Sequence, residues 1–140
     1  MSGFLLDTNV LSELIKPRPD QKVLGWIEAT AEELLFLSVL SFGEIRKGIA
    51  GLPAGARRAR LETWLETGLR QRFSGRILPI DEAVAHRWGS ITAAAAAAGR
   101  PVPVIDGLLA ATALQHNLTL VTRNTSDVAS TGVLVANPWE

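Results

Sequence analysis

The sequence predicts an α/β fold in which a central parallel β-sheet is flanked by helices in three layers. Short apolar runs, which are typical of buried strands, alternate along the chain with longer segments of helical periodicity. Capping residues and prolines stand at the expected ends of these helical segments. The chain has 140 residues, of which 47% are hydrophobic, so we expect residues 1–140 to form a single domain.

The first elements follow from apolar runs and capping residues. Residues 4–6 are apolar and end at Asp7, and we expect a buried strand there. Asp7–Asn9 then offer capping side chains to a helix that ends before Pro17. The next expected elements are a helix at about 21–30, a strand at 34–39 and a helix that opens at 41–44.

The longest helical pattern covers residues 54–73, directly after Pro53, with apolar side chains on one stripe. Asp81 is placed to cap a later helix, on which Val84 and Trp88 begin a second apolar stripe. The remaining expected elements are strands at 76–79, 119–122 and 133–135, and a helix that opens at Asp106 and ends near Asn117.

The composition excludes several kinds of site. The chain has no cysteine, which rules out disulfides, cysteine-bound zinc and thiol catalysis, and two histidines argue against a histidine cage for a metal. Fourteen basic residues balance fourteen acidic ones, so no overall basic field attracts nucleic acid. No apolar run approaches the roughly 18 residues of a membrane span, and the first residues lack the pattern of a secretory signal. We therefore expect a cytoplasmic protein with no membrane partner.

Four acids stand at junctions between elements, namely Asp7, Glu44, Asp106 and Asp127. Each has a structural explanation: Asp7 and Asp106 as helix caps, Ser41 with Glu44 as a capping box, and Asp127 in an Asx turn. The carboxyl ends of parallel strands share one edge of a sheet, so the four acids are also placed to converge. Converging carboxylates repel one another, and all-oxygen ligands suit Mg²⁺ or Mn²⁺. The residues alone leave both explanations open.

In their order along the chain, these residues resemble the motifs of the PIN-domain family, in particular VapC-type toxins of bacterial toxin–antitoxin modules and their FitB-like branch. The matching segments are Leu5–Val10, Ser38–Gly48, Asp106–Ala113, Thr122–Asn124 with Asp127, Ile77–Asp81 and Asn137–Trp139. The ordered set covers nearly the whole chain and is far more specific than any single motif. The resemblance implies the PIN fold, a Rossmann-like three-layer α/β arrangement.

The resemblance also implies a VapBC-type toxin that is an endoribonuclease dependent on Mg²⁺, with Mn²⁺ as a substitute. Its catalytic and metal-binding acids would be Asp7, Glu44, Asp106 and Asp127. The residues expected to hold these acids, a water or the phosphate are Asn9, Thr122, Arg123 and Asn124, with Arg46 as a second candidate phosphate contact. The implied partners are the RNA substrate, a second copy in a homodimer, and a VapB-like antitoxin that alone would bring DNA to the complex.

Two other functions are compatible with the residues. In a non-catalytic subunit of a toxin–antitoxin-like DNA-binding complex, the acids would serve only as caps. A magnesium-dependent phosphatase also places an aspartate after its first strand, but it needs a second one two residues later, where Asn9 stands. The sequence leaves open the RNA target, the number of metal ions, the antitoxin stoichiometry, and whether Asp127 or Asn124 completes the metal site.

The aromatic and histidine residues are expected to be structural. Trp64 and Trp88 lie on apolar stripes and should pack in the core or at a dimer interface, and Trp139 should pack back onto the domain. His86 and His116 lie on helical patterns away from the acidic motifs, and we expect each to be a solvated or hydrogen-bonded helix residue and not a catalyst.

Overall fold

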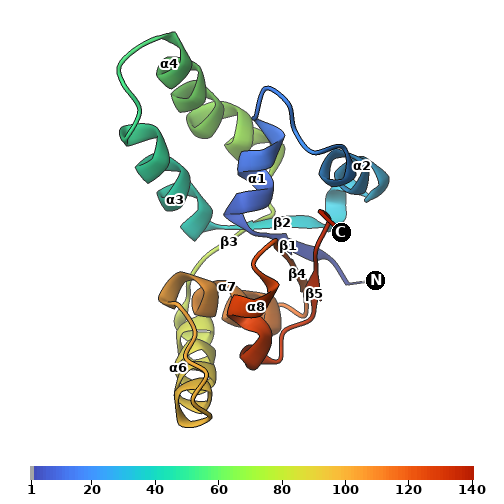
Figure 1. The fold of residues 1–140 in the computed structure, drawn as a ribbon, viewed down its shortest axis with the longest axis vertical. Helices are drawn as coiled ribbons and strands as arrows, with labels where there is room; N and C mark the ends of the chain where they lie inside the picture. Colours follow the sequence, from blue (N-terminus) through green and yellow to red (C-terminus); the bar gives the residue numbers. More distant parts are fainter. Residues whose placement is uncertain (1) are drawn as a thin grey trace.

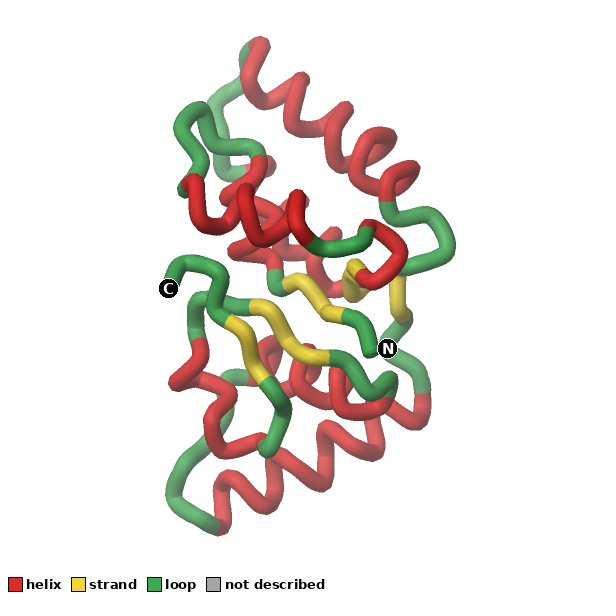
Figure 2. Tube along the Cα trace, turned by 90° about the vertical axis from the view of Figure 1, so that its right-hand side faces the viewer, coloured by secondary structure: helices red, strands yellow, loops and turns green. Residues whose placement is uncertain are grey.

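A computed structural model describes residues 2–140 and contains a five-stranded parallel sheet in the order β3-β2-β1-β4-β5 (Figures 1 and 2). The strands are β1 (Phe4–Leu6), β2 (Leu35–Ser38), β3 (Ile77–Leu78), β4 (Thr119–Val121) and β5 (Val135–Ala136). Every pairing is parallel, so the carboxyl ends of the strands lie at one edge of the sheet. The predicted α/β fold is confirmed.

Helices cover both faces of the sheet and give three layers (Figure 1). One face carries α1 (Thr8–Leu14), α2 (Gln21–Ala29), α3 (Val39–Ala50), α4 (Ala56–Thr63), the π-helical segment η2 (Trp64–Leu69) and α5 (Arg70–Arg72). The other face carries α6 (Glu82–Ala97), α7 (Val104–Gln115) and α8 (Thr125–Val128). Two single-turn 3₁₀ helices complete the list, η1 (Glu32–Leu34) and η3 (Ala129–Thr131).

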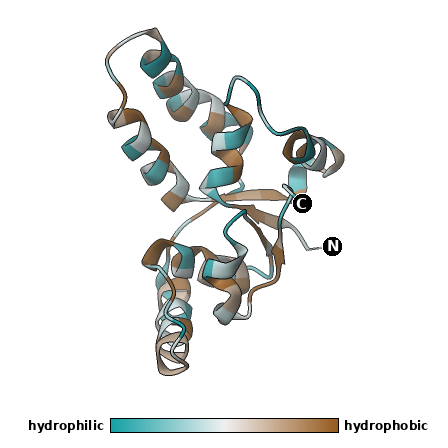
Figure 3. Ribbon diagram, in the orientation of Figure 1, coloured by the Kyte–Doolittle hydropathy of each residue, from teal (hydrophilic) through white to brown (hydrophobic). Residues whose placement is uncertain are grey.

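The core consists of two apolar clusters, one on each face of the sheet. Successive side chains of a strand point to opposite faces, so Leu6 belongs to the cluster under α1, α2 and α3, while Leu5 belongs to the cluster under α7 and α8. The strands are mainly hydrophobic, whereas the helices mix apolar and polar residues (Figure 3). The two clusters show that strand side chains are buried on both faces of the sheet. Because both faces of the sheet are covered, the polar residues that follow each strand gather at the carboxyl edge of the sheet.

Several element boundaries differ from the sequence-based prediction. The third helix begins at Val39 instead of residues 41–44, because the Ser38 side chain accepts a hydrogen bond from the Leu40 amide and caps it. The helix predicted over 54–73 covers 56–72 and contains the π-helical segment. The last strand lies at 135–136, where it pairs with β4, instead of 133–135.

The predicted structural side chains behave largely as expected. Trp64 is half-buried against the first core cluster, and Trp88 is half-buried beside Gly107. Both histidines, His86 and His116, are exposed. Within residues 2–140, no helix combines the length and the apolar character needed to span a membrane.

Gly3→Ala is expected to lower the free energy of unfolding by about 2 kcal/mol. An alanine Cβ would lie 2.6 Å from the Leu34 carbonyl oxygen and 2.9 Å from Phe36 Cε1. The Leu34 oxygen belongs to the backbone that leads into β2, so the strand itself would have to shift. Urea denaturation measures the effect, with Gly25→Ala as the matched control.

Gly25 lies inside α2, and an alanine Cβ there would have no neighbour within 4 Å. Alanine favours a helix interior over glycine, so this control should gain about 0.5–1 kcal/mol. A Gly3→Ala protein as stable as wild type would contradict the tight packing at β1.

Candidate active site

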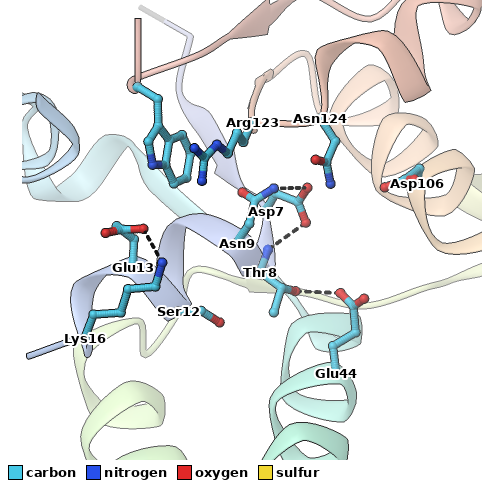
Figure 4. Close-up of a pocket in the computed structure, with 11 residues that line it drawn as sticks. Asp7, Thr8, Asn9, Ser12, Glu13, Lys16, Glu44, Asp106, Arg123 and Asn124 are labelled. Atoms are coloured by element: carbon cyan, nitrogen blue, oxygen red, sulfur yellow. Dashed lines mark hydrogen bonds and ion pairs between the residues drawn. The ribbon is translucent and has the colours of Figure 1, made fainter. Parts of the chain in front are cut away.

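A cavity of about 430 Å³ opens at the carboxyl edge of the sheet (Figure 4). Its walls come from the end of β1, from α1, α3 and α7, from the loop after β4, and from the carboxyl-terminal tail. The lining residues are Asp7, Thr8, Asn9, Ser12, Glu13, Lys16, Glu44, Asp106, Arg123, Asn124 and Trp139. Ten of these are polar or charged, in a protein whose interior on both sides of the sheet is apolar.

Asp7 stands at the centre of this cavity and is only 6% exposed. Its backbone amide donates to the Val121 carbonyl at 2.9 Å, which extends the β1–β4 pairing by one residue. Its Oδ1 accepts from the Thr8 amide at 2.7 Å, so the predicted helix cap is confirmed. Its Oδ2 accepts from the Thr122 hydroxyl at 2.7 Å and from Asn9 Nδ2 at 3.4 Å. The carboxylate is therefore fixed in one orientation.

Burial raises the pKa of the Asp7 carboxyl above its usual value. The hydrogen bonds from Thr122 and from the Thr8 amide oppose this rise, and the nearby charge of Glu44 adds to it. The folded protein thus holds a buried negative charge that it only partly compensates. A cation in the cavity would compensate the remainder.

Glu44 reaches the same cavity from the second turn of α3. Its Oε1 accepts from the Thr8 hydroxyl at 2.6 Å, and the buried Ser41 hydroxyl lies 2.9 Å from that Thr8 oxygen. The predicted Ser41–Glu44 capping box is wrong, because Ser38 caps α3. Both side chains instead face α1, and they tie α3 to the residue that follows Asp7.

Asp106 lies in the first turn of α7, which begins at Val104 after Pro103, so the predicted cap role of Asp106 is wrong. Its pKa is raised to about 6, first by burial and then by the negative charges of Asp7, Asp127 and Glu44. Asp106 is therefore close enough to all three other candidate acids for their charges to act on it.

Asp127 differs from the other three acids. It is exposed in the first turn of α8 and does not line the cavity, although its charge acts on Asp106. Its side chain accepts no hydrogen bond from the residues that the structure describes, so the predicted Asx turn is absent. The cavity wall at this position is formed by Asn124 instead.

The predicted supporting residues gather around Asp7. Thr122 is buried, and its hydroxyl oxygen also accepts from the Asn124 amide at 3.0 Å and from Asn9 Nδ2 at 3.3 Å. Arg123 lines the cavity and lies over the Trp139 ring. Arg46 lies elsewhere: it pairs with Glu62 and Glu66, so it is a surface salt-bridge residue.

The donor set fits a hard divalent cation. Every candidate ligand offers oxygen, which Mg²⁺ and Mn²⁺ prefer. Asn9 Oδ1 is buried and has no hydrogen-bond partner among residues 2–140, so it is free to accept a hydrogen bond at the edge of the cavity. The acids surround the cavity without converging on a point: in the described chain no group of three or more His, Asp or Glu side chains is close enough to hold an ion as arranged.

Sequence reasoning missed one wall of the cavity. Ser12, Glu13 and Lys16 line it, together with Asn9 at the start of α1. Positions 9, 12, 13 and 16 have the i, i+3, i+4, i+7 spacing of one helix face, so a polar stripe along α1 that continues to Lys16, just past its end, was the available signal.

Thr122→Val is expected to lower any metal-dependent activity of this site about 10- to 100-fold. Valine has the same shape but donates nothing to Asp7 Oδ2, so the pKa of Asp7 would rise further and ligation would weaken. Mn²⁺ titration and activity assays measure the effect. Thr112→Val is the matched control, because that buried hydroxyl donates only to the Leu108 carbonyl within α7. Equal activity of both variants would contradict the role of Thr122.

Comparison with known proteins identifies the family. The sequence matches the PIN domain family over residues 4–130. It is 40% identical over 136 residues to the VapC ribonuclease Y4jK of Sinorhizobium fredii, covering 97% of both chains. It is 41% identical over 135 residues to Toxin FitB of Neisseria gonorrhoeae, covering 96% of this chain and 97% of that one.

Solved structures agree with these relatives. FitAcB from Neisseria gonorrhoeae contains a chain that superposes with a TM-score of 0.93 at 40% identity, covering 98% of this chain and 99% of that one. FitAB bound to a DNA fragment gives the same TM-score at 39% identity, covering 98% and 96%. The chain therefore belongs to the PIN-domain family, within its VapC-type, FitB-like branch.

Proposed function

We propose that this protein is the toxin of a VapBC-type toxin–antitoxin module and hydrolyses RNA phosphodiester bonds with Mg²⁺ or Mn²⁺. The observation that carries the proposal is the cavity at the carboxyl edge of the sheet, where three separate elements contribute Asp7, Glu44 and Asp106. Relatives of about 40% identity over nearly the whole chain bear the names of a ribonuclease and a toxin.

Asp7, Glu44 and Asp106 would hold the ion, with Asp127 as a fourth acid whose negative charge helps to raise the pKa of Asp106. Once bound, the ion supplies an activated water and stabilises negative charge on the scissile phosphate. Asp7 is prepared for this role by its contacts with Thr8 and Thr122, which fix both carboxylate oxygens.

The side chains of Asn9 and Asn124 are placed to orient water or phosphate beside the acids. Asn9 Oδ1 has no hydrogen-bond partner among the described residues and is free to accept a hydrogen bond from a water, and the Asn124 side chain points towards the space between Asp7 and Asp106 (Figure 4). A covalent serine–histidine route finds no support here, because His86 and His116 are exposed and neither lines the cavity.

The partners are proposed from the relatives. FitAB is a complex bound to a DNA fragment, and we infer that this chain likewise pairs with a VapB-like antitoxin and reaches DNA only through it. A basic antitoxin side chain would neutralise the same acids that a metal ion needs. We further propose that the protein acts in the cytoplasm, where the RNA substrate is found. The homodimer is proposed from the resemblance to VapC-type toxins.

The test uses antitoxin-free protein and total RNA from the host. Wild type and Asp106→Asn are incubated in parallel with Mg²⁺ and with EDTA, and new 5′ ends are mapped by sequencing. Discrete ends that need both wild type and metal are expected, and they would identify the target. Wild type must first be shown to be folded and to bind metal. If it then gives no more new 5′ ends than Asp106→Asn does, the chain is instead a non-catalytic subunit of an antitoxin–DNA complex.

A further inference from the structure

The cavity carries opposite charge at its two ends (Figure 4). Glu44 and Asp106 lie on one side of Asp7, and Lys16 and Arg123 lie on the other. Arg123 there lies over the Trp139 ring. The acidic side is assigned to the metal ion by the proposed function. The basic side has no role in that assignment.

Arg123 is held in place without using its hydrogen bonds. Its guanidinium carbon lies 5.2 Å from the centre of the Trp139 ring, which is within the range of a cation–π contact. Among residues 2–140 the guanidinium donates no hydrogen bond and forms no ion pair. Its donors therefore remain available to a ligand in the cavity.

Trp139 provides a fixed support for Arg123. Its ring packs against the first core cluster, and its backbone amide donates to Asn137 Oδ1 at 3.0 Å. The tail thus returns to the domain, as the sequence predicted. A stacked guanidinium gives up less side-chain freedom when it binds an anion than a free arginine does.

Lys16 is held in place by an ion pair with the buried side chain of Glu13. Glu13 is buried, its Oε1 accepts from Lys16 Nζ at 2.9 Å, and its Oε2 accepts from the Asp20 amide at 2.8 Å. These contacts, with a smaller contribution from the charge of Arg123, hold the pKa of Glu13 below its usual value. Glu13 balances one of the two cations and uses one of the three Lys16 donors, so this end keeps a net positive charge.

We propose that Lys16 and Arg123 bind an RNA phosphate next to the scissile one, with Trp139 as the residue that positions Arg123. The proposal rests on the proposed function, because it assigns the second half of the same cavity. A guanidinium fork and an ammonium group converge well on a phosphate, and the acidic end repels that phosphate unless a metal ion is present. The basic end would therefore hold the neighbouring phosphate on the side of Asp7 away from Glu44 and Asp106.

The test measures binding separately from cleavage. The protein carries Asp106→Asn, and a fluorescent single-stranded RNA oligonucleotide is titrated in Mg²⁺ at several salt concentrations by anisotropy. Arg123→Gln added to this background should raise Kd about tenfold and reduce the slope of log K against log salt by about 0.7, the value of one phosphate contact. Lys16→Gln should act in the same direction.

Arg87→Gln is the matched control, because Arg87 is exposed on α6 and donates to Gln115 at the far end of α7 from Asp106. It should leave both Kd and slope unchanged. Arg123→Gln behaving like this control would overturn the proposal, as would a weaker Kd with an unchanged slope. A second titration uses a fluorescent glutamate-rich peptide. If Arg123→Gln loses binding to this peptide but binds RNA as before, the basic end binds a protein ligand and the proposal is overturned.

Trp139 is tested by a double-mutant cycle. Trp139→Leu should weaken RNA binding, whereas Trp139→Phe, which keeps an aromatic face, should restore it. Combining Trp139→Leu with Arg123→Gln should weaken binding no further than Arg123→Gln alone. Fully additive losses would overturn the positioning role. Failure of wild type to cut RNA would reject the proposed nuclease but leave these binding measurements interpretable.

Discussion

Asp7→Asn is expected to reduce metal-dependent RNA cleavage at least about 10³-fold while the protein stays folded. Asn keeps the shape of the side chain and an oxygen for the Thr8 amide, but it removes the negative charge at the centre of the cavity. A loss of 10³ corresponds to about 4 kcal/mol, which is the scale of metal-based stabilisation of a transition state. Activity on the mapped RNA site measures it.

The fold should tolerate this change because Asp7 is buried at a cost. Its pKa is raised by burial, so a neutral isostere removes an unfavourable charge and offsets the hydrogen bonds that it weakens. Asp81→Asn is the matched control: Asp81 caps α6 through the Val84 amide and lies outside the cavity. If Asp7→Asn and Asp81→Asn lose equal activity, the cap role of Asp7 is its only role.

The sheet was predictable because its strands are buried on both faces. A run such as Phe4–Leu6 has no polar residue, and only a strand covered by helices on both sides can bury every side chain of such a run. The following residue is then forced to the edge of the sheet, which is why Asp7 could be assigned from sequence. Glu44 and Asp106 also stand at element junctions, but position alone left their cap roles open, and the ordered motifs were needed to choose between the two explanations.

The local roles of these acids could not be read from sequence. Ser38 and Ser41 are both able to cap α3, and only packing against α1 decides that Ser38 does so and that Ser41 faces Thr8. Similarly, Pro103 allows α7 to start before Asp106. Capping depends on where a helix begins, and helix boundaries shift by one or two residues with tertiary contacts.

The basic wall of the cavity was predicted only in part: Arg123 was expected as a phosphate contact, whereas Lys16 was missed. Lys16 and Arg123 are 107 positions apart, and Trp139 lies in the tail, so no local pattern links them. The pairing of β1 with β4 brings the start of α1 and the loop after β4 together. Polar residues on α1 show a helical face by their spacing, but spacing does not reveal what that face meets.

Asp106→Asn is expected to stabilise the metal-free protein and to weaken metal binding at the same time. The pKa of Asp106 is about 6 in the folded protein and near 3.9 in an unfolded chain. Between these values the folded state binds more protons, so stability falls as pH rises from about 4 to 6 and stays lower above 6. Asp106→Asn has no carboxyl group to ionise at this position, so its free energy of unfolding should not show this fall.

At pH 7.5 the gain should be on the order of 1 kcal/mol, after discounting the shift for the partial exposure of Asp106. The melting temperature of the metal-free variant should then rise by about 3 °C, and no difference should remain near pH 4. Glu82→Gln is the matched control, because Glu82 is also an acid in the first turn of a helix but is exposed on α6. It should show no gain.

Metal binding should respond in the opposite direction. Protons compete with the ion for Asp106, so the Mn²⁺ affinity of wild type should fall below about pH 6, by up to about tenfold per pH unit. Asp106→Asn should bind Mn²⁺ about 10- to 100-fold more weakly at pH 7.5 and show a flatter pH dependence. Calorimetric titrations at pH 7.5 and 5 measure both effects. A structural acid would give lower stability and unchanged affinity when replaced, so the opposite signs of the two effects identify Asp106 as a ligand.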